Sequence, residues 1–159
     1  MTLIRRLVPL LQTVLVLLFA LLVMLQTFSF PGQFAHLASE HPDQAHLRWP
    51  LTAFVAVEIL CIQVVLVCTW RLLTMVRRDV IFTEAALRWV DVIIAALALA
   101  WVLAASGSLW AVWGADDPGT PLLLFVILLV AAVFGLVVVV MRELLRQATT
   151  LRTELETVI

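Results

Sequence analysis

The sequence predicts an all-α fold, an integral membrane four-helix bundle with both termini in the cytoplasm. Of its 159 residues, 64% are hydrophobic and only 13% are charged, and the mean hydropathy is +1.14. A soluble domain of this size could not cover so much apolar surface. Four apolar stretches each approach the roughly 20 residues that a bilayer core requires. We therefore interpret residues 1–159 as a single membrane domain.

The first predicted span covers about residues 7–28. Arg5 and Arg6 precede it, as basic residues precede the apolar region of a secretory signal peptide. This apolar region is too long for a signal peptide, however, and no A-x-A cleavage site follows it. We expect a retained helix.

Residues 29–50 then form a predicted outside loop that contains three histidines, His36, His41 and His46. Three imidazoles near Glu40 and Asp43 raise the question of a metal site. Histidines five residues apart do not share a helix face, and no pair has the i, i+4 spacing of a helical zinc site. We therefore favour a solvated loop, with no metal and no cofactor.

The second predicted span, about residues 51–73, contains Glu58 and Gln63. Glu58 belongs to a stripe at helical spacing that continues through Cys61, Val65, Cys68 and Leu72. Ionisable groups inside a span usually face the bundle interior and are candidate functional sites. The alternative is that Glu58 contributes only to packing, and the sequence leaves both interpretations open.

The third and fourth predicted spans, about 90–112 and 121–141, are joined by a short turn and should form a tight antiparallel hairpin. Small residues recur at every fourth position of the third span, which lets helices approach closely in lipid. These are Ala96, Ala100, Ala104 and Ser108. At a rise of about 1.5 Å per residue, Ser106 and Glu58 lie at similar depth. We therefore predict a hydrogen bond between Ser106 and Glu58.

Arginine counting gives the orientation. All ten basic residues are arginine, and only Arg48 falls on the outer side if four helices alternate. Such a bias over short loops indicates that both termini and the central segment, residues 71–88, are cytoplasmic. We expect the protein to lie in the bacterial plasma membrane.

Asp91, at the inner end of the third span, could form an ion pair with Arg71, Arg88 or Arg142.

The central segment is the first candidate docking surface for a partner. Its candidate residues are Arg77, Arg78, Asp79 and Phe82. Thr83 is in a position to cap the third span, and Glu84 suits its first turn.

The tail, residues 142–159, is predicted to be a cytoplasmic amphipathic helix that continues the fourth span without a break. Its apolar stripe consists of Leu144, Ala148, Leu151, Leu155 and Val158. The stripe could pack on the central segment, on the inner leaflet or on another protein. A helix that lies on the leaflet would be richer in basic residues. Leu151 and Leu155 are our candidates for binding a partner.

No Walker loop, dinucleotide-binding glycine pattern, nucleophile elbow, CxxC pair or HExxH motif occurs in the chain. We therefore expect no enzymatic activity. The net charge of −1 indicates no direct contact with nucleic acid.

Residues 78–88, RDVIFTEAALR, and the acidic, aliphatic-ended tail resemble a family of small four-helix bacterial membrane proteins known as domain of unknown function 2975. Ile81 stands where many members carry proline. The resemblance implies no catalytic residue. It suggests a regulatory role, because members are often encoded beside a very small helix-turn-helix regulator.

Two functions remain in competition. The first is a regulatory or scaffold protein in the lipid bilayer that binds a small cytosolic helix-turn-helix partner. The second is a small transporter or channel subunit that uses the intramembrane Glu58. The sequence leaves open whether copies assemble into a homo-oligomer.

Overall fold

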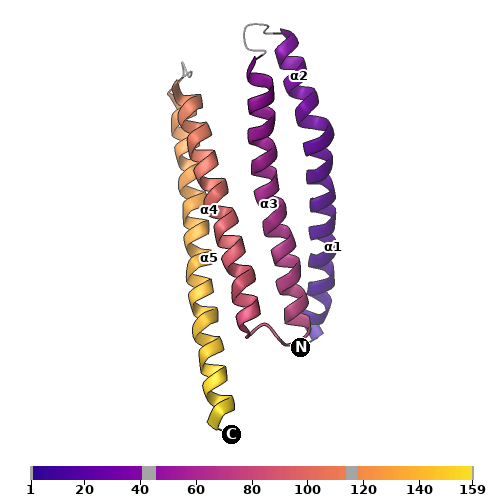
Figure 1. Ribbon diagram of the computed structural model, residues 1–159, viewed down its shortest axis with the longest axis vertical. Coiled ribbons are helices and arrows are strands. Elements are labelled where there is room, and N and C mark those ends of the chain that lie inside the picture. Colours follow the sequence, from indigo (N-terminus) through magenta and orange to yellow (C-terminus); the bar gives the residue numbers. More distant parts are fainter. Residues whose placement is uncertain (1, 41–45, 114–117, 159) are drawn as a thin grey trace.

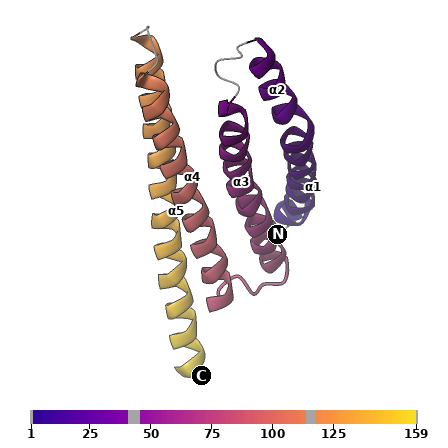
Figure 2. The same ribbon diagram turned by 45° about the horizontal axis from the view of Figure 1, so that its top comes forward.

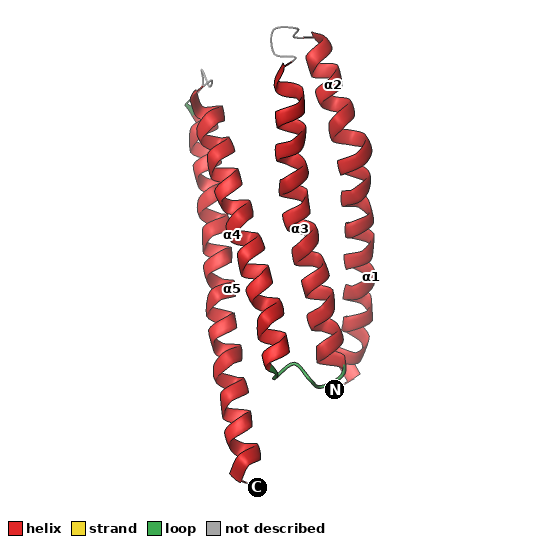
Figure 3. Ribbon diagram, in the orientation of Figure 1, coloured by secondary structure: helices red, strands yellow, loops and turns green. Residues whose placement is uncertain are grey.

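The computed structural model describes residues 2–40, 46–113 and 118–158, and all regular secondary structure within these ranges is helical (Figure 3). The helices are α1 (Thr2–Met24), the π-helical turn η1 (Leu25–Ser29), α2 (Phe30–Glu40), α3 (Arg48–Arg77), α4 (Glu84–Trp113) and α5 (Gly119–Val158). Four continuous helical segments are long and apolar enough to cross a membrane. The prediction of an all-α chain with four such helices is confirmed.

The first helical segment is longer than predicted, because η1 and α2 continue it to Glu40. The expectation of a loop over residues 29–40 is therefore wrong. Pro31 lacks an amide donor, and its ring would crowd the carbonyl four residues earlier. The widened turn η1, in which the Phe30 amide donates to the Leu25 carbonyl, precedes this proline and lets the helix continue.

The second segment also begins earlier than predicted, at Arg48, with Pro50 in its first turn. Proline is tolerated there because the first amides of a helix have no intrahelical acceptor. His36 lies on α2, with its Nε2 atom 3.5 Å from Glu40 Oε1, and His46 lies in a short 3₁₀ turn. His41 and Asp43 lie outside the described residues.

The long helices form an open row in chain order, with α1 beside α3, α3 beside α4, and α4 beside α5 (Figures 1 and 2). Among the described residues, no Cα atoms come within 8 Å between α1 and α4, α1 and α5, or α3 and α5. The four-helix bundle that we expected is thus an open row of helices. In a bilayer, an apolar helix face gains little by leaving lipid for another helix, so membrane-spanning helices do not have to close into a bundle.

The start of α1, the connection between α3 and α4, and the end of α5 lie at the same end of the row (Figure 1). At this end α5 extends well beyond the other helices (Figures 1 and 2). The four long helical segments therefore run in alternating directions, as the arginine count assumes.

Helix α3 ends in a Schellman motif. Asp79 has a φ of 55°, in the left-handed region. The Asp79 amide donates to the Val76 carbonyl at 3.2 Å, and the Val80 amide donates to the Met75 carbonyl at 3.1 Å. These two bonds satisfy the last carbonyls of the helix and turn the chain.

Helix α4 begins at Glu84, directly after Thr83, as the sequence predicts. The Thr83 carbonyl accepts from the Ala86 amide at 3.0 Å. The Thr83 hydroxyl donates to the Val80 carbonyl at 2.9 Å, so it braces the connection rather than capping the amides of α4. Hydrogen bonds therefore fix the central segment both at the end of α3 and at the start of α4.

Candidate functional site

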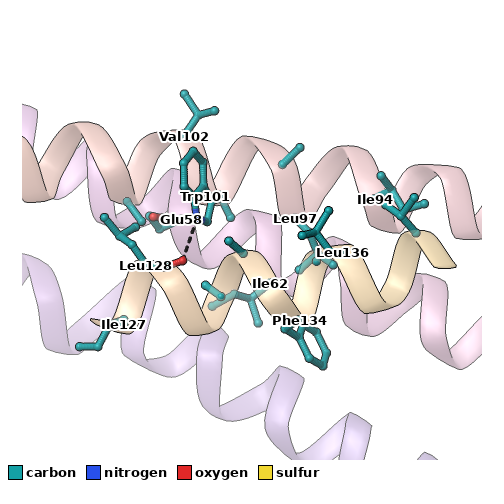
Figure 4. A pocket seen from close by; sticks show the side chains of 17 residues that line it. Glu58, Ile62, Ile94, Leu97, Trp101, Val102, Ile127, Leu128, Phe134 and Leu136 are labelled. Carbon is teal, nitrogen blue, oxygen red and sulfur yellow. Dashed lines mark hydrogen bonds between the residues drawn. The ribbon is translucent and has the colours of Figure 1, made fainter. Parts of the chain in front are cut away.

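Helices α3, α4 and α5 surround a cavity of about 440 Å³ (Figure 4). Of the 17 described residues that line it, Glu58 is the only charged one. Glu58 is half-buried, and no hydrogen bond or ion pair joins its carboxyl group to another described side chain. Glu58, which we expected to face the interior of the fold, thus lies on the wall of an apolar cavity.

The predicted hydrogen bond between Glu58 and Ser106 does not form. The exposed Ser106 hydroxyl donates to the Leu103 carbonyl of its own helix at 2.7 Å. The next residue, Gly107, faces α3 instead, and a Cβ atom added there would lie 2.8 Å from Phe54 Cζ. Helix α4 is therefore rotated so that Gly107, not Ser106, meets α3.

Gln63 is buried and lies on the side of α3 that faces the first helix. Its Nε2 atom donates to Gln26 Oε1 at 3.2 Å, and Gln26 Nε2 donates to the Ala56 carbonyl at 3.4 Å. Residues five apart on a helix point about 140° apart, which separates Gln63 from Glu58. The two polar candidates of this span therefore belong to different sites, and Gln63 ties η1 to α3.

A second glutamine network lies nearer the central segment. Buried Gln12 donates from Nε2 to Thr74 Oγ1 at 3.4 Å, and Arg77 Nη1 donates to Gln12 Oε1 at 3.3 Å. Gln12 and Gln26 were not among the candidate residues predicted from the sequence. Their spacing of 14 residues is close to four helical turns, so two amides on one face of an apolar span were the available signal.

An ion pair joins α4 to α5 near the end of the row that carries the central segment. Arg142 Nε donates to Asp91 Oδ1 at 2.7 Å, and Arg142 Nη2 donates to Asp91 Oδ2 at 3.2 Å. The forked geometry fixes orientation as well as distance. Of the three arginines that the sequence allowed for Asp91, the structure selects Arg142. Arg71 instead lies over the Trp89 ring, with its Cζ atom 5.6 Å from the centroid.

The candidate docking residues of the central segment are all exposed. Arg77 is the one of them that binds the first helix, through Gln12. Phe82 is 41% exposed, and the Arg152 guanidinium of the tail lies 5.8 Å from its ring centroid. This contact joins the central segment to the tail, so the two candidate docking surfaces are neighbours.

Helix α5 runs without a break into the tail, as the sequence predicts. Most of the apolar stripe is exposed: Leu144 by 53%, Leu151 by 60%, Leu155 by 68% and Val158 by 86%. Ion pairs and contacts to the rest of the chain come from another face of the tail, which carries Arg142 and Arg152. The stripe therefore does not pack on the central segment.

Among residues 2–40, 46–113 and 118–158, no group of three histidine, cysteine, aspartate or glutamate side chains is arranged to hold a metal ion. Cys61 and Cys68 are buried free thiols.

A family model described as "Protein of unknown function (DUF2975)" matches residues 32–159 of the chain. Neither a curated protein nor a solved structure matches it. The match begins within α2 and includes all of α3, α4 and α5, and hence the cavity, the central segment and the tail.

Proposed function

We propose that this chain, which belongs to the DUF2975 family of proteins of unknown function, is a membrane docking protein. In this proposal the four long helices cross a bacterial plasma membrane, with both termini in the cytoplasm. The tail binds a small cytosolic protein, and the family resemblance suggests a helix-turn-helix regulator. The role requires no catalysis.

The observation that carries this proposal is the exposed stripe on the tail. Residues 142–158 continue α5 for about 25 Å at 1.5 Å per residue. They continue along the axis of α5 and pass the end of the neighbouring helices (Figure 1). A helix in this direction leaves the bilayer rather than lying along it. Its apolar stripe then faces water unless a protein covers it, and an i, i+3, i+4, i+7 stripe is a common peptide-recognition surface.

The position of the central segment supports the same role. Because Arg152 contacts Phe82, the exposed Phe82 lies beside the middle of the tail. A partner bound to the tail stripe could therefore also contact Arg78 and Asp79, which are exposed on the same connection. Aromatic and arginine side chains are the residue types that contribute most at protein interfaces.

The test is a double substitution in the stripe, Leu151→Asp with Leu155→Asp. Two carboxylates in an apolar contact should abolish capture of the partner from native membranes, measured by affinity purification and mass spectrometry. A matched control, Thr150→Asp with Thr157→Asp, adds the same charge to exposed positions away from the stripe and should keep capture. If the stripe variant captures the same proteins as the wild type, the tail is not the docking surface.

A small transporter or channel subunit is the second candidate function, and the cavity beside Glu58 favours it. Solute or proton flux into liposomes that is lost in Glu58→Gln, but unchanged in the stripe variant, would favour this function over docking.

A further inference from the structure

We infer that the cavity between α3, α4 and α5 is a binding site for a lipophilic organic cation, with the Glu58 carboxylate as the opposite charge. This inference goes beyond docking by the tail and requires no transport. It depends on the shape of the cavity, on the isolation of its carboxylate and on its aromatic wall.

The cavity exists because α3 and α5 both pack on α4 but not on each other. Its volume of about 440 Å³ falls within the range of small-molecule sites, about 300–1,000 Å³. Two further cavities lined by the same three helices continue it along α4, one of about 710 Å³ toward the outer loops and one of about 300 Å³ toward the tail. A ligand with a bulky apolar body therefore has space along the helices.

The charge of Glu58 has no counterpart in the described part of the chain. Arg48 and Arg71 lie about 15 and 20 Å from Glu58 along the axis of α3, at 1.5 Å per residue. Each of these arginines lies over a tryptophan ring. Arg142 of α5 already binds Asp91. A carboxylate in an apolar membrane cavity is costly unless it is paired, so a cationic ligand supplies what this cavity lacks.

The donor set argues for an organic cation rather than a metal ion. Calcium and magnesium need six or more oxygen ligands, whereas Glu58 is the only carboxylate among the described lining residues. A small hydrated cation would also lose its water in this cavity without replacement. A cation that carries its own apolar groups loses little hydration, and its apolar body gains contact with the walls.

The wall beside Glu58 includes an aromatic ring with a fixed position. Trp101 and Glu58 line the same cavity (Figure 4), and the Trp101 indole Nε1 atom donates to the Leu128 carbonyl of α5 at 3.0 Å. This bond satisfies the polar edge of the indole and does not involve its π face. Tryptophan is the side chain best suited to contact a cation through its ring.

The experiment measures equilibrium binding of radiolabelled tetraphenylphosphonium to the full chain in detergent. We expect saturable binding that is weakened at least tenfold in Glu58→Gln and at least threefold in Trp101→Leu, while Glu58→Asp keeps most of it. Glu154→Gln, which removes an exposed carboxylate of the tail, is the matched control and should bind as the wild type does. The variant Leu151→Asp with Leu155→Asp should also bind normally, so failure of docking and failure of this site are separate results.

Tetraphenylborate, an anion of similar size and hydrophobicity, controls for simple partition into the micelle. Its uptake should not depend on Glu58. The inference is overturned if Glu58→Gln binds tetraphenylphosphonium within twofold of the wild type, or if the wild type binds both ions equally. It is also overturned if Glu58→Gln changes the oligomeric state in size-exclusion chromatography, because Glu58 would then lie between two copies of the chain.

Discussion

Asp79 is the residue on which the path of the central segment depends. Among the described non-glycine residues, it alone has a positive φ. Asparagine and aspartate tolerate this left-handed conformation better than other non-glycine residues, whereas a β-branched side chain would be strained by about 1–2 kcal/mol. The two Schellman hydrogen bonds to Val76 and Met75 depend on it.

Substitutions at Asp79 should therefore rank by backbone preference. We expect Asp79→Val to lower the free energy of unfolding by about 1–2 kcal/mol, and Asp79→Gly to be neutral or stabilising. Thermal unfolding in detergent, followed by circular dichroism, measures both. Asp79→Asn is the control, since it removes the charge and keeps the preference. Equal stability of the valine and glycine variants would show that the turn is not left-handed in solution.

At the residue scale, the sequence predicted which side chains are unusual better than which side chains meet. Glu58 was identified because a carboxyl group in an apolar span is costly, and the structure places it on a cavity wall. The prediction that Ser106 binds Glu58 was wrong, because the depth of a residue fixes only its position along the helix axis. Rotation about the axis decides contact, and the close approach of Gly107 to Phe54 sets that rotation.

At the scale of the helices, the long apolar helices could be predicted from the sequence. The helix within the first expected outside loop could not. Pro31 and Gly32 are breaker signals in sequence reasoning. The π-helical turn Leu25–Ser29 takes up the proline, and α2 follows. Nothing in the local composition distinguishes a proline after a widened turn from a proline in a loop. The continuous α5 was predictable, because no glycine or proline follows Gly135.

The ion pair between Asp91 of α4 and Arg142 of α5 can be tested directly. A double-mutant cycle with Asp91→Asn and Arg142→Gln should give a small but measurable favourable coupling, because both side chains are partly exposed and solvent screens their charges. Unfolding in detergent at low salt measures it. The same cycle with Arg88→Gln in place of Arg142→Gln should give no coupling, because Arg88 does not bind Asp91 in the structure. Coupling to Arg88 alone would contradict the assigned pair.

At the scale of the whole molecule, the number of helices and their alternation followed from hydropathy and arginine counting, but their open row did not. A helix that is apolar on all sides carries no periodic signal to say which face meets a neighbour. The order of neighbours is marked instead by particular side chains, such as Gln12 and Gln26 of the first helical segment, which form hydrogen bonds with α3. The cavity beside Glu58 is a consequence of the open row of helices. The sequence therefore identified the carboxyl group in the cavity but not the residues that line it.

The threading makes a prediction that concerns the entire chain. The connection after α3 and the tail lie at one end of the row, and the end of α2 lies at the other (Figure 1). The arginine bias assigns the first end to the cytoplasm. In a chain whose two cysteines are replaced by alanine, a membrane-impermeant thiol reagent applied to intact cells should therefore label Ser39→Cys and leave Arg78→Cys and Thr150→Cys unlabelled. All three positions are exposed or half-exposed, so permeabilised cells should label all three and serve as the control. Labelling of Arg78→Cys but not Ser39→Cys in intact cells would reverse the orientation and place the proposed docking surface outside the cell.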